Sequence, residues 1–172
     1  MDPRQRSLFG AAYLVGYAAA CARGGLDAMA FGAPTGPFGF IYRPTDHAQP
    51  WFDDPTNAAA IYPAFHVVAG LTSGSGRPLL ATEVSRPGVI EALGWREQGR
   101  KRLWVANLTA APVEVTVAGL SPATARASVL DAQSFVRAAR DAEALDALTA
   151  PLATDRIRLD GYAVARIDWP SP

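Results

Sequence analysis

The first pattern along the chain is a mostly apolar stretch, Ser7–Ala22, with no charged side chain inside it. Small or apolar residues recur there at spacings of three and four, which places them on one face of a helix. That face comprises Leu8, Ala12, Val15, Ala19 and Ala22. Gly24 and Gly25 follow and are typical of a helix end. The pattern predicts a buried amphipathic helix.

The same stretch also has the order of a secretory signal. Arg4 and Arg6 precede it, and small residues lead to Cys21. It is too short and too rich in Ala and Gly to span a membrane comfortably. We therefore expect a buried helix in a cytoplasmic protein with no membrane span. Export, with residues 1–22 as the signal, remains the alternative.

Beyond this helix, residues 26–76 read as strand, loop and helix. Leu26–Gly32 is a short apolar run and predicts a buried parallel strand. Residues 33–60 are rich in Pro, Gly, aromatic residues and Asp, and a loop of this length usually carries function. Pro63 suits the first turn of a helix, which we expect over residues 63–71.

From Leu79 onward apolar and polar residues alternate with a period of two, which predicts strands. The candidates are Leu79–Val84, Val89–Glu97, Lys101–Leu108, Val113–Ala118, Ala125–Leu130, Arg156–Leu159 and Tyr162–Asp168. Residues 98–100 and 109–112 have the composition of hairpin turns. Seven short strands with regular turns favour an antiparallel β-sandwich. Residues 131–150 fit either a short helix or an irregular excursion.

Composition narrows the possible functions. Lys+Arg and Asp+Glu number 16 each, and this balance argues against nucleic acid as a partner. One cysteine, Cys21, excludes an internal disulfide framework and a multi-thiolate metal site. With His47 and His66 as the only histidines, we expect neither a metal site nor a cofactor.

Three segments carry a resemblance to a known family: SLFGAAYLVGYAAACARGGLDAMAFGAPTGPFGF, IYPAFHVVAGL and ALGWREQGRKRLWVANLTAAPVEVTV. They resemble the C-terminal third of D-apionate lactonase and its relatives, which look like clan-A glycoside hydrolases with a (β/α)8 barrel and an accessory β-sandwich. The resemblance implies an α+β chain. Residues 1–76 would be the last helix–strand–helix units of the barrel, and residues 77–172 the β-sandwich.

This resemblance has a consequence for catalysis. Barrel enzymes carry their chemistry at the C-terminal ends of several strands, and the acid and nucleophile of clan-A hydrolases would lie upstream of Met1. We therefore expect no catalytic residue in this chain. Its partner would be the missing barrel portion, with which it would act, or a second copy of itself. A stand-alone carbohydrate-binding or structural β-sandwich module is the alternative function.

The loop after the expected barrel strand would overhang the mouth of a complete barrel. Its substrate candidates are Thr35, Tyr42, Arg43, His47 and Trp51. An aromatic ring of Tyr42 or Trp51 would stack on a sugar, and Arg43 would meet a carboxylate. In the simpler interpretation Trp51, Phe38 and Phe52 hold the loop onto the fold.

Three further groups are candidate sites. Asp53 and Asp54 adjoin in sequence, and Asp54 is more plausibly a turn residue than a catalytic one. His66 is most simply a packed histidine. Trp95 and Trp104 are core residues or, if both are exposed, a platform for a sugar ring.

Overall fold

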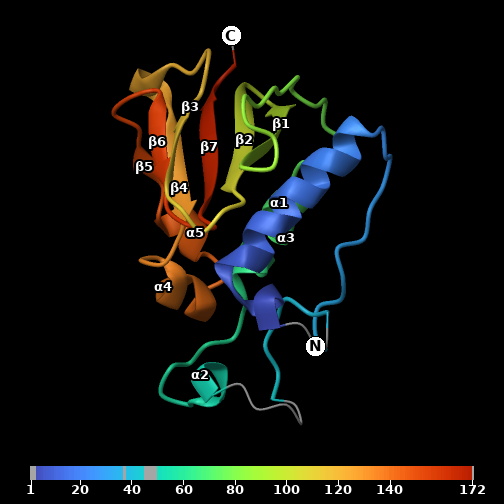
Figure 1. The fold of residues 1–172 in the computed structure, drawn as a ribbon, viewed down its shortest axis with the longest axis vertical. Coiled ribbons are helices and arrows are strands. Elements are labelled where there is room, and N and C mark those ends of the chain that lie inside the picture. Colours follow the sequence, from blue (N-terminus) through green and yellow to red (C-terminus); the bar gives the residue numbers. More distant parts are fainter. Residues whose placement is uncertain (1–2, 37, 45–49, 172) are drawn as a thin grey trace.

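The computed structural model describes residues 3–36, 38–44 and 50–171. A short 3-10 helix, η1 (Pro3–Arg6), leads into α1 (Leu8–Arg23), and α2 (Pro50–Asp53) and α3 (Pro63–Thr72) follow. All seven named strands lie after α3. Figure 1 shows α1 running alongside α3, with the sandwich beside them and α2 on a long connection beyond. Within the described ranges, no helix is long and apolar enough to cross a membrane.

The first helix forms where the periodicity predicted it. Ala12, Val15 and Ala19 of the predicted face are almost fully buried. Ala11, Leu14 and Ala18 are buried as well, because α1 contacts both α3 and the strands β1 (Ile90–Glu97) and β2 (Arg100–Asn107). Small side chains on two faces allow this double contact, which a wider residue would prevent.

The strand expected over Leu26–Gly32 does not form. Those residues carry no strand hydrogen bonds, and Leu26 is 51% exposed. The only bridge nearby joins Ala33 to Gly39. A parallel barrel strand takes its hydrogen bonds from neighbours on both sides, and no described strand lies beside this segment.

The sandwich consists of a five-stranded and a two-stranded sheet. The larger has the order β1-β2-β7-β4-β5, with all neighbours antiparallel, and the smaller pairs β3 with β6. The remaining strands are β3 (Val113–Thr116), β4 (Arg126–Leu130), β5 (Ala150–Pro151), β6 (Arg156–Leu159) and β7 (Val164–Pro170). The predicted antiparallel sandwich is thereby confirmed.

Two predictions within the sandwich need correction. Residues 79–84 are not a strand; they form one isolated bridge, Leu79 to Trp95. Residues 109–112 do not close a hairpin, because they carry the chain from β2 to β3 in the other sheet. The buried Asn107 shapes this crossing: its side chain donates to the Ala111 carbonyl at 2.7 Å and accepts from the Thr109 amide at 3.0 Å.

Residues 131–150, for which the sequence allowed two alternatives, form a helical excursion that leads into a strand. It contains α4 (Phe135–Arg140), α5 (Ala144–Ala147) and β5. Ala138, Ala139, Ala144 and Leu145 are buried. The backbone amides of Ala60 and Ile61 both donate to the Ala139 carbonyl, at 2.8 and 3.1 Å. The excursion therefore holds the end of the 33–60 loop.

The five-stranded sheet is the middle layer of the molecule. Alternate residues of β2 face opposite cores: Leu103 and Val105 join the cluster shared with β3 and β6, whereas Trp104 and Ala106 join the cluster shared with α1 and α3. Period-two alternation with both faces apolar is the pattern of a sheet covered on both sides.

Trp95 and Trp104 are core residues, and their burial excludes the sugar platform. They are 2% and 0% exposed. Gly70 of α3 lies so close to Trp104 that a Cβ there would enter the indole ring, and a Cβ on Gly74 would lie 2.7 Å from Trp95. The two glycines let α3 approach the sheet more closely than any other residue would.

We predict that Gly70→Ala destabilises the chain although alanine is the better helix former. Helix propensity favours alanine by about 1 kcal/mol, whereas overpacking against a rigid ring costs about 1–3 kcal/mol. Urea unfolding measures the difference, with Ala69→Ser on the exposed side of the same helix as control. Trp104→Phe should reduce the penalty of Gly70→Ala in a double-mutant cycle; simple additivity would contradict the contact.

Candidate functional site

The structure brings two of the loop candidates, Tyr42 and Trp51, into one cluster and places Thr35 and Arg43 on the surface. Thr35 lies exposed on a tight bend in which the amides of Phe40 and Ile41 donate to the Pro34 carbonyl at 3.1 and 2.9 Å. Arg43 is exposed, and His47 lies outside the described residues. Only Tyr42 and Trp51 are part-buried among other side chains.

Tyr42 and Trp51 belong to an aromatic cluster that fastens the loop. The Phe52 ring lies 5.4 Å from Tyr42, 5.0 Å from Trp51 and 4.9 Å from Tyr62. Trp51 also contacts Phe135 of α4, with ring centroids 5.3 Å apart. These tilted and edge-to-face geometries are those of packed aromatic cores.

The simpler interpretation of the loop is therefore correct for Trp51 and Phe52. It is wrong for Phe38, which is 71% exposed. Two further contacts hold the same loop: the Asn57 side-chain amide donates to the Trp51 carbonyl at 2.7 Å, and Arg140 of α4 donates to the Asn57 carbonyl. These contacts leave Thr35 and Arg43 exposed, since both lie outside the aromatic cluster.

Asp54 is a turn residue, as expected. Its Oδ1 accepts hydrogen bonds from the Thr56 hydroxyl at 2.7 Å and from the Thr56 amide at 2.9 Å. Both hydrogen bonds from Thr56 lower the pKa of Asp54, and the bond from the hydroxyl lowers it more than the bond from the backbone amide. A carboxylate committed to its own turn is unavailable for acid–base chemistry.

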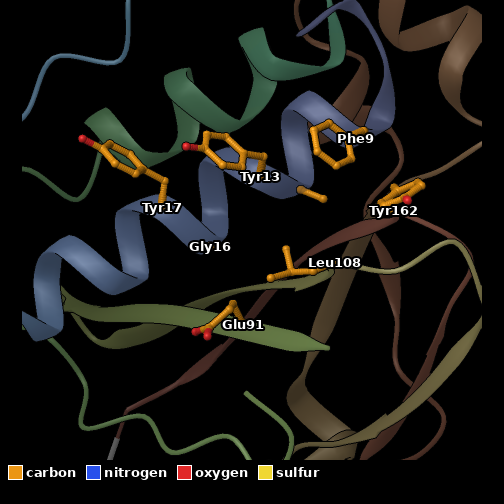
Figure 2. A pocket seen from close by; sticks show the side chains of 8 residues that line it. Phe9, Tyr13, Gly16, Tyr17, Glu91, Leu108 and Tyr162 are labelled. Carbon is orange, nitrogen blue, oxygen red and sulfur yellow. The ribbon is translucent and has the colours of Figure 1, made fainter. Parts of the chain in front are cut away.

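A pocket that the sequence reasoning missed lies between α1 and the edge of the large sheet (Figure 2). Its volume is about 350 Å³, and it is lined by Phe9, Ala12, Tyr13, Gly16, Tyr17, Glu91, Leu108 and Tyr162. Gly16 makes room for it, because a Cβ there would lie 3.4 Å from the Leu108 side chain. In Figure 2 the Glu91 side chain lies on the strand below α1.

Glu91 is the one carboxylate among the residues that line this pocket. It is 7% exposed, and Arg23 Nη1 lies 2.8 Å from its Oε2. The pairing neutralises the carboxylate and ties the end of α1 to β1. The alternation of residues along β1 could have revealed this position of Glu91, since it shares a face with Leu93 and Trp95, which pack against the helices.

A second polar cluster, also unforeseen, lies on the helix-facing side of β2 and β7. Arg102 binds Asp168 through two nitrogens, at 2.7 and 3.3 Å, and donates to the Ser73 hydroxyl at 3.3 Å. Arg166 pairs with Asp146 at 2.6 Å and lies 3.5 Å from Asp168. Each charge has a partner, so the cluster ties α3 and α5 to the sheet and leaves no reactive group free.

His66 is a packed histidine, as expected. It is 3% exposed, and its Nε2 lies 2.9 Å from the Ala138 carbonyl, to which it donates. Burial lowers its pKa, and the Ala138 carbonyl, Asp141 and Asp146 oppose that shift only in part. Neutral His66 joins α3 to α4.

The described side chains include no group of three or more His, Cys, Asp or Glu that would hold a metal ion. The candidate loop and the pocket offer aromatic surfaces, paired charges and the exposed Arg43.

Comparison with protein families matches both halves of the chain. Residues 1–76 match the model "D-apionate lactonase, TIM barrel domain", and residues 87–167 match "D-apionate lactonase, C-terminal immunoglobulin-like domain". The D-apionate lactonase of Brucella anthropi is 27% identical over 123 residues, which is 72% of this chain and 18% of that protein. The chain therefore spans less than a fifth of this relative's length.

The fold is shared with a solved structure, and a second one aligns in part. A family 30 subfamily 8 xylanase from Clostridium acetobutylicum aligns over 96% of this chain and 40% of its own, with a TM-score of 0.54 and 11% identity. A family 30 endoxylanase from Clostridium papyrosolvens aligns over 64% of this chain and 28% of its own, with a TM-score of 0.44 and 13% identity.

We predict that acidification destabilises this chain partly through His66. Its pKa is about 6.5 when unfolded and lower when folded. The unfolded state therefore binds the proton first, and the stability present above about pH 6.5 falls as the pH drops through the folded pKa. His66→Gln keeps a donor without the titration. Urea unfolding from neutral to acidic pH should show a shallower loss for His66→Gln; parallel curves would contradict the assignment.

The two family models leave only residues 77–86 and 168–172 unmatched. The chain belongs to the D-apionate lactonase family, as a piece that joins part of the barrel domain to the C-terminal immunoglobulin-like domain.

Proposed function

We propose that this chain is the C-terminal portion of a hydrolase that opens sugar-acid lactones such as apionolactone, and that it is not catalytic alone. One observation carries the proposal: the match to the barrel domain covers only residues 1–76. Eight strand–helix units need about 250 residues. The groups that do the chemistry would therefore be supplied by the missing barrel.

Three carboxylates near the candidate sites support the second half of this proposal. Hydrolysis of a lactone needs a group that activates water and donors for the oxygen that gains charge. Asp54 is held in its own turn, whereas Glu91 and Asp168 are paired with arginines. None is placed to activate water.

In the proposed reaction, water attacks the lactone carbonyl carbon and forms the new C–O bond. The ring C–O bond then breaks, the departing ring oxygen takes a proton, and a hydroxy acid carboxylate results. Arg43 is exposed on the loop that would overhang the barrel mouth, and a guanidinium matches a carboxylate in charge and shape. We assign Arg43 to binding the carboxylate that forms when the ring opens. A cytoplasmic location stays a prediction.

The stand-alone module is less well supported because α1 exposes an aromatic ridge. Tyr13 and Tyr17 are 56% and 43% exposed, and Phe38 beside them is 71% exposed. Tyr13 stacks between Phe9 and Tyr17, at ring distances of 6.3 and 6.1 Å. We refer to Phe9, Tyr13, Tyr17 and Phe38 as the α1 ridge. A contiguous apolar surface of this kind marks an interface.

The direct test supplies the missing part. The fragment of the Brucella anthropi lactonase that precedes its aligned region is produced together with this chain, and hydrolysis of apionolactone is followed by acid release. We expect no hydrolysis by either piece alone and hydrolysis by the pair. Hydrolysis by this chain alone would disprove the placement of the catalytic groups outside it.

In the active pair, Arg43→Ala should weaken inhibition by the hydroxy acid product about tenfold or more, with smaller changes in kcat and in KM for the neutral lactone, because a charge-assisted hydrogen bond to the product carboxylate is lost. Arg77→Ala, at an exposed arginine outside the loop, is the matched control. Equal effects of the two substitutions would remove Arg43 from the substrate site.

We also predict that the isolated chain self-associates through the α1 ridge. Tyr13→Ser with Tyr17→Ser should shift it toward monomer in sedimentation and leave the far-UV circular dichroism unchanged, since both rings are largely exposed. Val136→Ser, an exposed apolar position on α4, is the control. A wild-type chain that sediments as a monomer would contradict the prediction.

A further inference from the structure

The two sheets of the sandwich are unequal, and part of the large sheet therefore lacks cover. Five strands face two. A groove of about 800 Å³ lies between β1 and β2 on one side and β3 on the other. Its floor includes Ile90, Ala92, Leu103 and Val105, which belong to the core between the sheets. In a sandwich such inner faces are covered by a facing strand.

β3 borders this groove with an open edge. It pairs only with β6 among the described strands, in the register Val113↔Leu159 to Thr116↔Arg156. One step further on, the Val117 amide donates to the Asp155 carbonyl at 2.9 Å. Because hydrogen-bonded pairs alternate in antiparallel strands, Val113, Val115 and Val117 bond to β6. The backbone groups of Glu114 and Thr116 then point to the open edge.

The opposite wall of the groove has the residue alternation of a strand but lacks the regular backbone hydrogen bonds of one. Residues 80–86 line it. The Leu80 amide donates to the Gly94 carbonyl at 2.8 Å and the Arg96 amide to the Pro78 carbonyl at 2.9 Å. Beyond Leu80, the Thr82 hydroxyl donates to the Ala92 carbonyl of β1 at 3.4 Å. Leu80, Thr82 and Val84 are half-buried, and the residues between them are exposed. This is strand alternation.

We propose that the β3 groove, defined as the space between residues 80–86 and β3, receives an extended segment from the missing part of the protein, which adds a strand to the β3 edge. The proposal rests on the proposed function, because that part is also the barrel-bearing one. Alternate side chains of the segment would be apolar and β-branched, to cover Ile90, Leu103 and Val105. Its backbone would pair with Glu114 and Thr116.

The missing part is the occupant that fits best. The aligned region is only 18% of the relative's length, so most of that polypeptide lies elsewhere. A second copy of this chain is a poorer source, because its seven strands are already paired within their own sheets. It would have to release residues 80–86 from β1.

The test is hydrogen exchange of this chain with and without the Brucella anthropi fragment described above. Alone, the amides of Glu114 and Thr116 should exchange fast and that of Val115 slowly. With the fragment, all three should be protected. Thr116→Pro removes an amide that faces away from β6, so the chain should still fold. That substitution should weaken fragment binding about tenfold, the effect of one lost hydrogen bond and its neighbours, whereas Thr116→Ala should not.

Outcomes in which the fragment does not protect β3 overturn the proposal. If the fragment does not bind, or binds without protecting Glu114 and Thr116, the β3 groove is not its seat. Protection of these amides in the chain alone, in step with its concentration, would assign the groove to a second copy. Lactone hydrolysis without protection of β3 would support the proposed function and contradict this inference. Protection of β3 without hydrolysis would support this inference and contradict the proposed function.

Discussion

The contact of α3 with the tryptophan face of the large sheet is the constraint on which the rest of the structure depends. Trp104 is completely buried where Gly70 passes over it, and Trp95 is buried beneath Gly74. Glycine at both positions allows the helix to lie directly on the indole rings. Any added carbon would displace one of two rigid bodies, because protein interiors are close-packed. This contact joins the barrel-derived helices to the sandwich in one core (Figure 1).

Polar contacts extend the same junction at its margins. Arg23 reaches from α1 to Glu91 on β1, Arg102 reaches Ser73 at the end of α3, and His66 reaches the Ala138 carbonyl. Each places a charged or polar group of one half against its counterpart in the other. Breaking such a buried pair leaves an unsatisfied group behind, so these contacts favour one arrangement of the two halves.

The sandwich also positions the candidate loop. The amides of Ala60 and Ile61 and the ring of Trp51 are held by α4, an excursion of the sandwich domain. The sandwich domain thus fixes the base of a loop that, in the proposed enzyme, would lie over the barrel. In the proposed enzyme its role would be structural support of the substrate loop, and the open β3 edge would link it to the rest of the polypeptide.

Several features followed from the sequence alone because their causes are local. The periodicity of Ser7–Ala22, Pro63 at a helix start and the alternation after Val89 each depend on neighbours within a few residues, and each element forms. The family was also recognisable from its packing motifs. Other features depended on distant partners. Leu26–Gly32 has the composition of a strand but no neighbour to bond with, and residues 79–84 have the alternation but only one bridge. Phe38 is apolar yet exposed, and Trp95 was ambiguous until α3 covered it. Composition sets what a segment can form, and only the tertiary structure decides whether a hydrogen-bonding or packing partner is present.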